Sequence, residues 1–136
     1  MRLLLGGLLV AALAGCGGHA KTSAPAPHKA KPAIRVRLLA DTHRPRVGTP
    51  WHYEVRVTDV AGKPVAATVH LQILFGGVPV GQVGRHRVAN GVWSETIGKD
   101  GNVPFPARAR GVRLVFEAVV TALGQTKRAH YWIRAR

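Results

Sequence analysis

The chain has 136 residues, a length that suits one domain. Hydrophobic residues make up 46% of the sequence, which is enough for a buried core and excludes a wholly disordered chain. A single cysteine excludes an internal disulfide framework and any zinc site built from several cysteines. The chain has 20 Lys and Arg but only six Asp and Glu, which gives a formal net charge of +14.

The first 16 residues predict export and a lipid anchor. A basic residue follows the first Met, and residues 3–14 form an apolar run of 12 residues, well short of the roughly 20 that a membrane-spanning helix needs. The run ends in the residues Leu13, Ala14, Gly15 and Cys16. This segment resembles the signal of bacterial lipoproteins, whose lipobox has the form Leu-Ala/Ser-Gly/Ala-Cys. The resemblance implies cleavage after Gly15, a diacylglycerol on the sulfur of Cys16, and a location at the outer face of the cell membrane; the alternative is an ordinary secretory signal.

Residues 17–33 predict a flexible tether. The segment has no Leu, Ile, Val or aromatic residue and no acid, but it contains three prolines and three lysines. Such a composition cannot bury enough surface to fold, and 17 residues at ~3.1 Å each extend over roughly 50 Å. In an alternative interpretation the lysines also contact anionic lipid head groups. The chain therefore divides into a signal peptide (1–15), the anchored Cys16 with its tether (16–33) and a folded domain (34–136).

From Ile34 onward, apolar and polar residues alternate with period two, the pattern of half-buried strands. The clearest runs cover residues 34–38, 51–58, 65–75, 112–121 and 128–134. Turn residues separate them at 61–64, 76–77 and 123–124. Asn90-Gly91 predicts a two-residue hairpin between Val88 and Val92, since a type I′ turn needs positive φ at both central residues. The spacing predicts about seven strands in an all-β sandwich.

Aromatic residues in these runs predict the centre of the core. The candidates are Trp51, Tyr53, Phe75, Phe116 and Tyr131. Trp93 and Trp132 fit either the core or the surface. Phe105 lies between two prolines in the longest predicted loop, and we expect it to be buried as a plug rather than presented to a partner.

A motif near the second predicted strand resembles bacterial Ig-like modules. Those modules often read hydrophobic-x-Asp-x-x-Gly-x-Pro-Val, and this chain has that pattern from Val57 to Val65, with Asp59, Gly62 and Pro64 at the fixed positions. The closing pair of runs also resembles the final two strands of such modules. The resemblance implies an Ig-like antiparallel β-sandwich of about seven strands without the antibody-type disulfide. It does not imply a function, because fold does not determine function.

The sequence predicts no enzyme and no catalytic residue. Serine chemistry needs a positioned serine, histidine and acid, and Ser94 lies in a predicted strand without the context of a nucleophile elbow. Carboxylate-pair chemistry needs two converging acids, whereas Glu54, Glu95 and Glu117 are isolated on predicted strands among arginines. We expect these three glutamates to be ion-paired surface groups.

The positive charge is explained either by composition or by an electrostatic partner. Arginines recur at alternating positions, and the candidate polyanion-binding residues are Arg35, Arg37, Arg85, Arg87, Arg108, Arg110 and Arg113, with Arg128, Arg134 and Arg136 in similar sets. Residues two apart share one strand face, so such pairs would form rows that attract acidic wall polymers, anionic lipid, glycans or extracellular DNA. The export signal disfavours intracellular nucleic acid. The alternative is that the charge reflects composition and protects strand edges from aggregation.

Seven histidines raise a metal-binding alternative. His52, His70 and His130 are weak candidate ligands on predicted polar faces, but no pair has close ligand spacing. Some small Ig-like bacterial proteins with a Gly-x-Pro-Val turn resemble copper-handling modules, which favour Met and His. The only Met here is Met1, which is lost with the signal. We therefore predict no cofactor and a membrane-anchored binding or scaffolding domain, with the acidic-polymer binder and the metal-binding module as alternatives.

Overall fold

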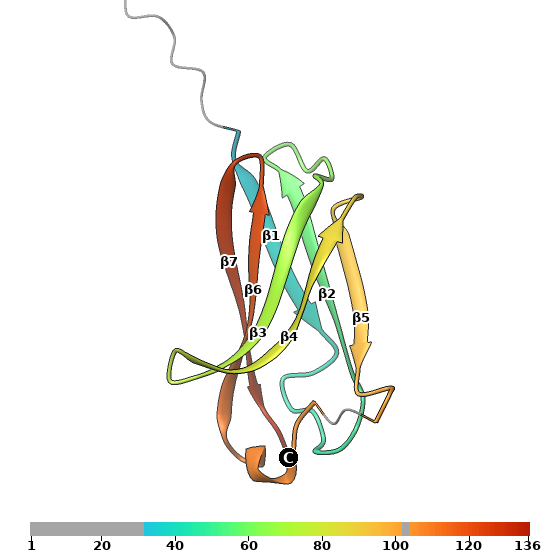
Figure 1. Cartoon of the computed structure of the whole chain (residues 1–136), viewed down its shortest axis with the longest axis vertical. Coiled ribbons are helices and arrows are strands. Elements are labelled where there is room, and N and C mark those ends of the chain that lie inside the picture. The colour runs from blue at the N-terminus through green and yellow to red at the C-terminus, as the bar shows by residue number, and fades with distance from the viewer. Residues whose placement is uncertain (1–31, 102–103) are drawn as a thin grey trace, which may run out of the picture. The chain divides into compact units, whose positions relative to one another are not determined.

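A computed structural model describes residues 32–101 and 104–136 (Figure 1). The strands are β1 (Ile34–Ala40), β2 (Trp51–Asp59), β3 (Ala67–Phe75), β4 (Val78–Val88), β5 (Val92–Ile97), β6 (Arg113–Ala122) and β7 (Gln125–Arg134), with one 3-10 turn, η1 (Ala107–Ala109). In these two ranges no helix has the length and apolar character to cross a membrane. The predicted signal peptide, Cys16 and most of the predicted tether lie outside the described residues.

The strands form two antiparallel sheets that pack face to face. One sheet has the order β1-β2-β5 and the other has the order β4-β3-β6-β7. This arrangement confirms the predicted Ig-like β-sandwich of seven strands. The start of β1 and the C-terminus lie at opposite ends of the sandwich (Figure 1).

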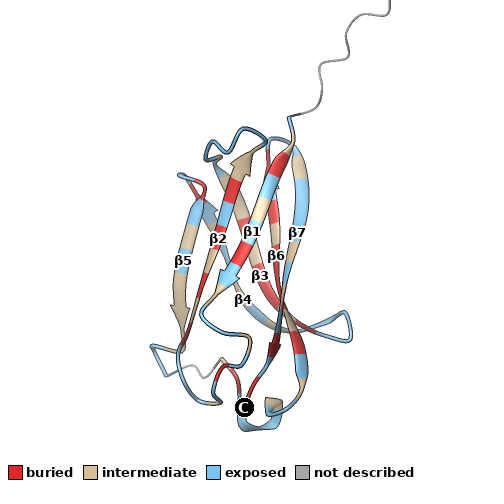
Figure 2. Cartoon of the chain, turned by 180° about the vertical axis from the view of Figure 1, so that it is seen from behind, coloured by how far each residue is buried: buried red, intermediate tan, exposed pale blue. Residues whose placement is uncertain are grey.

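The core lies between the sheets and follows the alternation of the sequence. Exposed residues occupy every second position of β1, and buried residues alternate with mostly half-buried ones along β2 (Figure 2). Trp51 is at the centre, with its ring centroid 5.5 Å from that of Phe105 and 5.2 Å from that of Phe116, both in edge-on geometry. Phe105 is fully buried, which confirms its predicted role as a plug, and Tyr53 is also fully buried. Tyr131 is partly buried and packs against this cluster.

The prediction for Phe75 is wrong, because its side chain is 55% exposed. The pairing of β3 with β4 shifts register twice, between Leu71 and Gln72 and between Ile73 and Leu74. Both shifts leave the extra residue on β4, so the alternation along β3 continues, and Phe75 lines the same hollow as Ile73. Phe75 is exposed because it is the last residue of β3, in a hairpin that projects sideways from the sandwich (Figure 1).

The hairpin predicted at Asn90-Gly91 is also wrong. β4 pairs with β3 and β5 pairs with β2, so these residues carry the chain from one sheet to the other. Only Gly91 of the two has a positive φ, at 69°. Two-residue turns with positive φ at both positions instead join β3 to β4, at Gly76 (57°) and Gly77 (83°), and β6 to β7, at Leu123 (50°) and Gly124 (69°). A two-residue turn signal does not reveal which strand each neighbour will pair with.

Candidate anion-binding site

Six exposed arginines gather at the end of the sandwich opposite the start of β1. They come from the β1–β2 loop, from the segment that leads into β6, and from the C-terminal residues: Arg44, Arg46, Arg110, Arg113, Arg134 and Arg136. Three shallow hollows of about 340, 370 and 420 Å³ lie between them, and each hollow is lined by at least three of the six. We call this set the arginine end.

Backbone pairing holds two of the three segments together. Arg134 N donates to His43 O, Arg136 N donates to Pro45 O, and Val47 N donates to Arg136 O, each at 2.9 Å. This is the pattern of two parallel strands, with one donor missing because proline has no N–H. The extended backbone buries Pro45, so Arg44 and Arg46 on either side of it project outward.

The C-terminal segment uses the same alternation, and the third segment is bonded to it. Ala135 is buried between the exposed Arg134 and Arg136, and its carbonyl accepts a hydrogen bond from Gly111 N at 2.8 Å. That bond places Arg110 and Arg113 beside the other four arginines. The Cζ atom of Arg113 also lies 5.8 Å from the centroid of the Trp132 ring, within the range of a cation–π contact.

No Asp or Glu neutralises the arginine end. All six acidic residues of the chain fall within the described ranges, and none of them forms an ion pair with the six arginines. Asp41, on the same loop as Arg44, instead lies 3.3 Å from His52 Nδ1. Like charges held together without a paired Asp or Glu side chain create a positive potential that attracts anions. The arginine end therefore has the electrostatics of an anion-binding surface.

The predicted arginine rows are only partly brought together. Arg35 and Arg37 are both exposed on β1 of the three-stranded sheet, whereas Arg85 and Arg87 are exposed on β4 of the other sheet. Arg108 lies on η1 beside an apolar hollow. Of the candidate set, Arg110 and Arg113 belong to the arginine end.

Sequence reasoning missed Arg44 and Arg46. The signal was present, because Arg44-Pro45-Arg46 has the same spacing of two as the recognised pairs. The segment lies between two predicted strands, so the alternation expected of strands does not cover it.

The three candidate metal ligands lie apart. His70 Nε2 is 2.7 Å from Gln82 Oε1 and His130 Nε2 is 2.7 Å from Glu117 Oε2, both on the four-stranded sheet. His52 lies on the other sheet. Within the described part of the chain, no group of three or more His, Cys, Asp or Glu could hold a metal ion.

His52 forms contacts that resemble those of a serine-hydrolase relay. Its Nε2 atom is 2.8 Å from Ser94 Oγ, and its Nδ1 atom is 3.3 Å from Asp41 Oδ1. These side chains lie on the outward face of the three-stranded sheet, and those of His52 and Asp41 are 40% and 62% exposed. A hydrolase also needs oxyanion donors and a substrate pocket beside the serine. We therefore interpret the relay as a surface link between β2, β5 and the end of β1, and assign no chemistry to it.

The glutamates differ from the expectation of ion-paired surface groups. Glu54 is paired with Arg56, as predicted. Glu95 lies 3.8 Å from His86 Nε2 and accepts a hydrogen bond of 2.5 Å from the hydroxyl of Tyr53. Burial together with this hydrogen bond raises the pKa of Tyr53 above its ordinary range. Glu117 is ion-paired with Arg128, as predicted, but the prediction that it is a surface group is wrong, because it is only 3% exposed.

Glu117 is buried because neighbouring side chains on the same sheet cover it. Its oxygens accept hydrogen bonds from Gln72 Nε2 at 2.6 Å and Arg128 Nη1 at 2.8 Å, and His130 contacts it as described above. Burial by itself raises the pKa of Glu117, but the hydrogen bonds from Gln72 and His130 and the charge of Arg128 outweigh that effect. The pKa of Glu117 is therefore lowered.

Comparisons with known proteins bear on the fold alone. No family model matches the sequence, and no curated protein matches it. Among solved structures, the CARDB domain of a Pyrococcus furiosus protein, in complex with di-metal ions, superposes with a TM-score of 0.51. The match covers 79% of this chain and 90% of that one, at 16% identity. At this identity the likeness supports the β-sandwich assignment, and the metal ions are a property of that protein.

Proposed function

We propose that this protein is an exported, lipid-anchored binding protein, and that its non-catalytic β-sandwich binds an anionic component of the cell envelope through the arginine end. The anchor is inferred from the residues Leu13 to Cys16. The observation that carries the binding function is the gathering of six arginines at one end without an Asp or Glu partner.

Anionic polymers suit this surface better than single small anions. One exposed arginine–anion contact contributes about 0–1 kcal/mol, so a single contact binds weakly. A polymer with repeated carboxylate or phosphate groups contacts several arginines at once, and guanidinium groups bind both kinds of anion in a bidentate manner. The metal-binding alternative has no described ligand set to support it, and we do not propose it.

The test compares two matched double variants in the chain from residue 16 onward with Cys16→Ser, which removes only the site of acylation. R44Q/R134Q removes two charges from the arginine end, and R35Q/R37Q removes two charges from β1. Binding of poly-L-glutamate and of polyphosphate is measured by calorimetry at about 0.05 M and about 0.5 M NaCl. We expect R44Q/R134Q to weaken binding about tenfold, equivalent to ~1.4 kcal/mol.

The control should lose no more than about twofold, which is what a small change in net charge produces at this ionic strength. Binding should also weaken strongly at the higher salt concentration. Equal losses in the two double variants would refute a localised site, and absence of binding to both polymers at low salt would refute the proposed function.

A further inference from the structure

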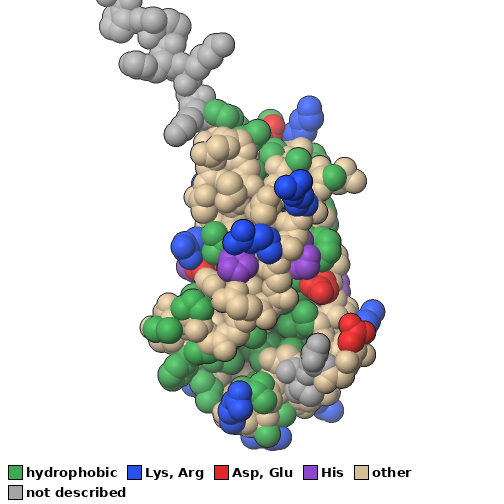
Figure 3. Space-filling view, in the orientation of Figure 1, with side chains coloured by type: hydrophobic (Ala, Val, Ile, Leu, Met, Phe, Trp, Pro, Cys, Tyr) green, Lys and Arg blue, Asp and Glu red, His purple; other side chains and the backbone are tan. Residues whose placement is uncertain are grey.

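The β3–β4 hairpin exposes large apolar side chains. Phe75, Val78 and Val80 are 55%, 62% and 59% exposed, although they lie within six residues of one another. Gly76 and Gly77 both have positive φ and close the hairpin in a tight two-residue turn. Figure 3 shows apolar side chains gathered over this hairpin, toward the end of the domain where η1 lies. Concentrated apolar exposure of this kind marks an interaction surface.

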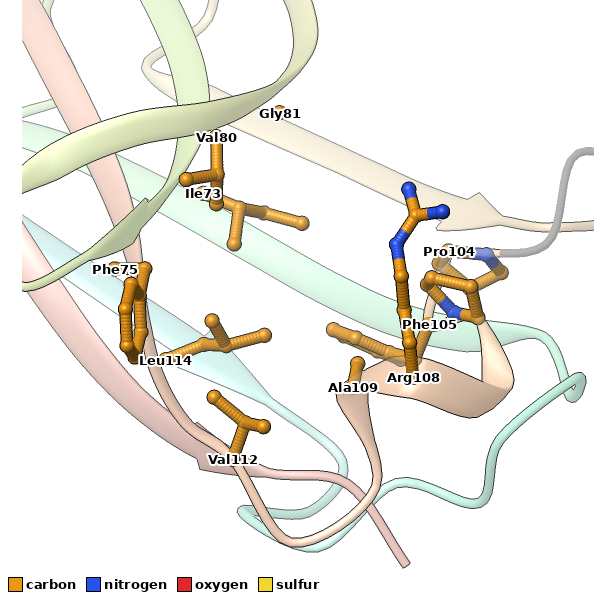
Figure 4. Close-up of a pocket in the computed structure, with 11 residues that line it drawn as sticks. Ile73, Phe75, Val80, Gly81, Pro104, Phe105, Arg108, Ala109, Val112 and Leu114 are labelled. Carbon is orange, nitrogen blue, oxygen red and sulfur yellow. The ribbon is translucent and has the colours of Figure 1, made fainter.

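An apolar hollow of about 390 Å³ lies between this hairpin and the segment 104–114 (Figure 4). Phe75 and Val80 line it on the hairpin side, and Val112 and Leu114 line it on the other side. Among the described residues that line it, Arg108 alone is charged. The hollow therefore suits an apolar group that carries a negative charge at its edge.

The apolar surface and the arginine end are contiguous. On the outward face of the four-stranded sheet, the buried Leu74, the partly exposed Val115 and the exposed Trp132 are neighbours in register. Trp132 is exposed and is contacted by Arg113 of the arginine end. On the other side, η1 and the residue after it link Arg108 at the hollow to Arg110 of the arginine end. One end of the domain thus combines exposed apolar side chains, a tryptophan and arginines.

We infer that this end of the sandwich docks on the surface of an anionic lipid bilayer, with the tip of the β3–β4 hairpin entering the interfacial region. The inference rests on the proposed function, since the arginines supply the attraction to anions, and it names the anionic partner as a membrane. Arginines lie at the level of anionic head groups, tryptophan favours the membrane–water interface, and apolar side chains enter the acyl boundary.

Two other occupants fit these residues less well. A soluble acidic polymer would use the arginines but would leave Phe75, Val78 and Val80 in water. A second copy of the chain would bring two arginine ends together, and like charges across an interface disfavour association. A bilayer that contains anionic lipid satisfies both the charged and the apolar parts of the surface.

The distance from the predicted anchor permits this contact. The start of β1 is at the opposite end of the domain, and a strand of ten residues is roughly 33 Å long. The 17 residues between Cys16 and Ile34 can span up to roughly 55 Å. The end of the domain that carries the arginines and the β3–β4 hairpin can therefore reach the same bilayer that would hold the lipid at Cys16.

The experiment uses the Cys16→Ser chain from residue 16, so that an acyl anchor cannot contribute. Binding is measured by flotation with vesicles of phosphatidylcholine and phosphatidylglycerol, with phosphatidylcholine vesicles as the neutral comparison. Quenching of tryptophan fluorescence by brominated lipid separates insertion from adsorption. F75S/V78S removes the apolar tip, and V60S/L123N is its control, because Val60 and Leu123 are exposed apolar residues in other turns.

We expect binding and quenching with anionic vesicles only. F75S/V78S should weaken vesicle binding about tenfold or more but leave poly-L-glutamate binding within about twofold, because apolar insertion is lost while the charge is kept. R44Q/R134Q should weaken both, and V60S/L123N should weaken neither. All of these positions are exposed, and thermal unfolding verifies that each variant is folded.

The possible failures are distinguishable. If F75S/V78S leaves vesicle binding unchanged, the inference of membrane docking is overturned. It is also overturned if the chain binds poly-L-glutamate but does not bind vesicles. In both cases the proposed function stands. Absence of binding to vesicles and to polymer at low salt would overturn both. Capture of a protein partner through the hairpin without vesicle binding would also refute the bilayer as the occupant.

Discussion

The replacement Glu117→Ala tests the buried carboxylate on the four-stranded sheet. Of its three hydrogen-bonding partners, Arg128 and His130 have side chains that are more than half exposed, so water can replace the carboxylate for them. Gln72 is buried and would lose its partner. Loss of a buried hydrogen bond to a charged group is worth about 1.5–3 kcal/mol. We therefore expect the free energy of unfolding at neutral pH to fall by ~2 kcal/mol, or Tm by roughly 10 °C.

The effect should depend on pH, because the pKa of Glu117 is lowered in the folded protein. A carboxyl with a lowered folded pKa stabilises the fold above its unfolded pKa, and this contribution is lost as the pH falls through the folded pKa. The difference in unfolding free energy between the wild type and Glu117→Ala should therefore be largest near neutral pH and should shrink in acid.

Urea unfolding at about pH 7 and about pH 3, followed by tryptophan fluorescence, measures both quantities. Glu54→Ala is the control, because Glu54 is also a strand glutamate but pairs with the exposed Arg56, and we expect it to lose no more than about 0.5–1 kcal/mol. A loss below ~0.5 kcal/mol for Glu117→Ala at neutral pH, or a loss that stays constant in acid, would refute this reasoning.

Four further substitutions test turns and the anchor. In urea unfolding, Gly91→Ala should destabilise the domain by about 3 kcal/mol and Gly124→Ala by about 1 kcal/mol. Both glycines have φ of 69°, but only at Gly91 would the new Cβ clash, because it would lie 2.5 Å from Val57 O. Equal losses would contradict this steric argument. Leu123→Asn should raise the free energy of unfolding by about 0.5–1 kcal/mol, because asparagine tolerates positive φ better than leucine; a loss of stability would count against it. Cys16→Ser in the full chain should release the protein from isolated membranes, and complete retention would reject the lipid anchor.

The fold could be predicted because burial and alternation are local properties of strands. The runs beginning at Ile34 and Trp51 have apolar residues at every second position, and the structure buries or half-buries these positions. Phe75 follows the same alternation but is exposed, because it lies at the end of β3 in a hairpin that extends beyond the core. The pairing partners of β4 and β5, on either side of Gly91, could not be predicted either, because strands distant in sequence decide which sheet each one joins.

The arginine end could be predicted only in part, because long-range pairing assembles it. Arg110 and Arg113 were in the candidate set. Their association with Arg44 requires residues 43–47 to run beside residues 134–136, about 90 positions later in the chain. No pattern within one segment contains that information. Glu117 was misassigned for a related reason, since the residues that cover it come from β3 and β7.

The positions of the arginines argue against a purely compositional origin of the positive charge more strongly than the number of arginines does. Composition determines how many arginines the chain has, but topology determines where they meet. Sixteen Lys and Arg and all six acids lie within residues 32–136, and strand acids such as Glu54 and Glu117 pair with cations in the middle of the sheets. The six arginines at one end have no such partner. If composition alone explained the charge, R35Q/R37Q and R44Q/R134Q would reduce anion binding equally, whereas a binding surface at the arginine end requires the second double variant to lose far more.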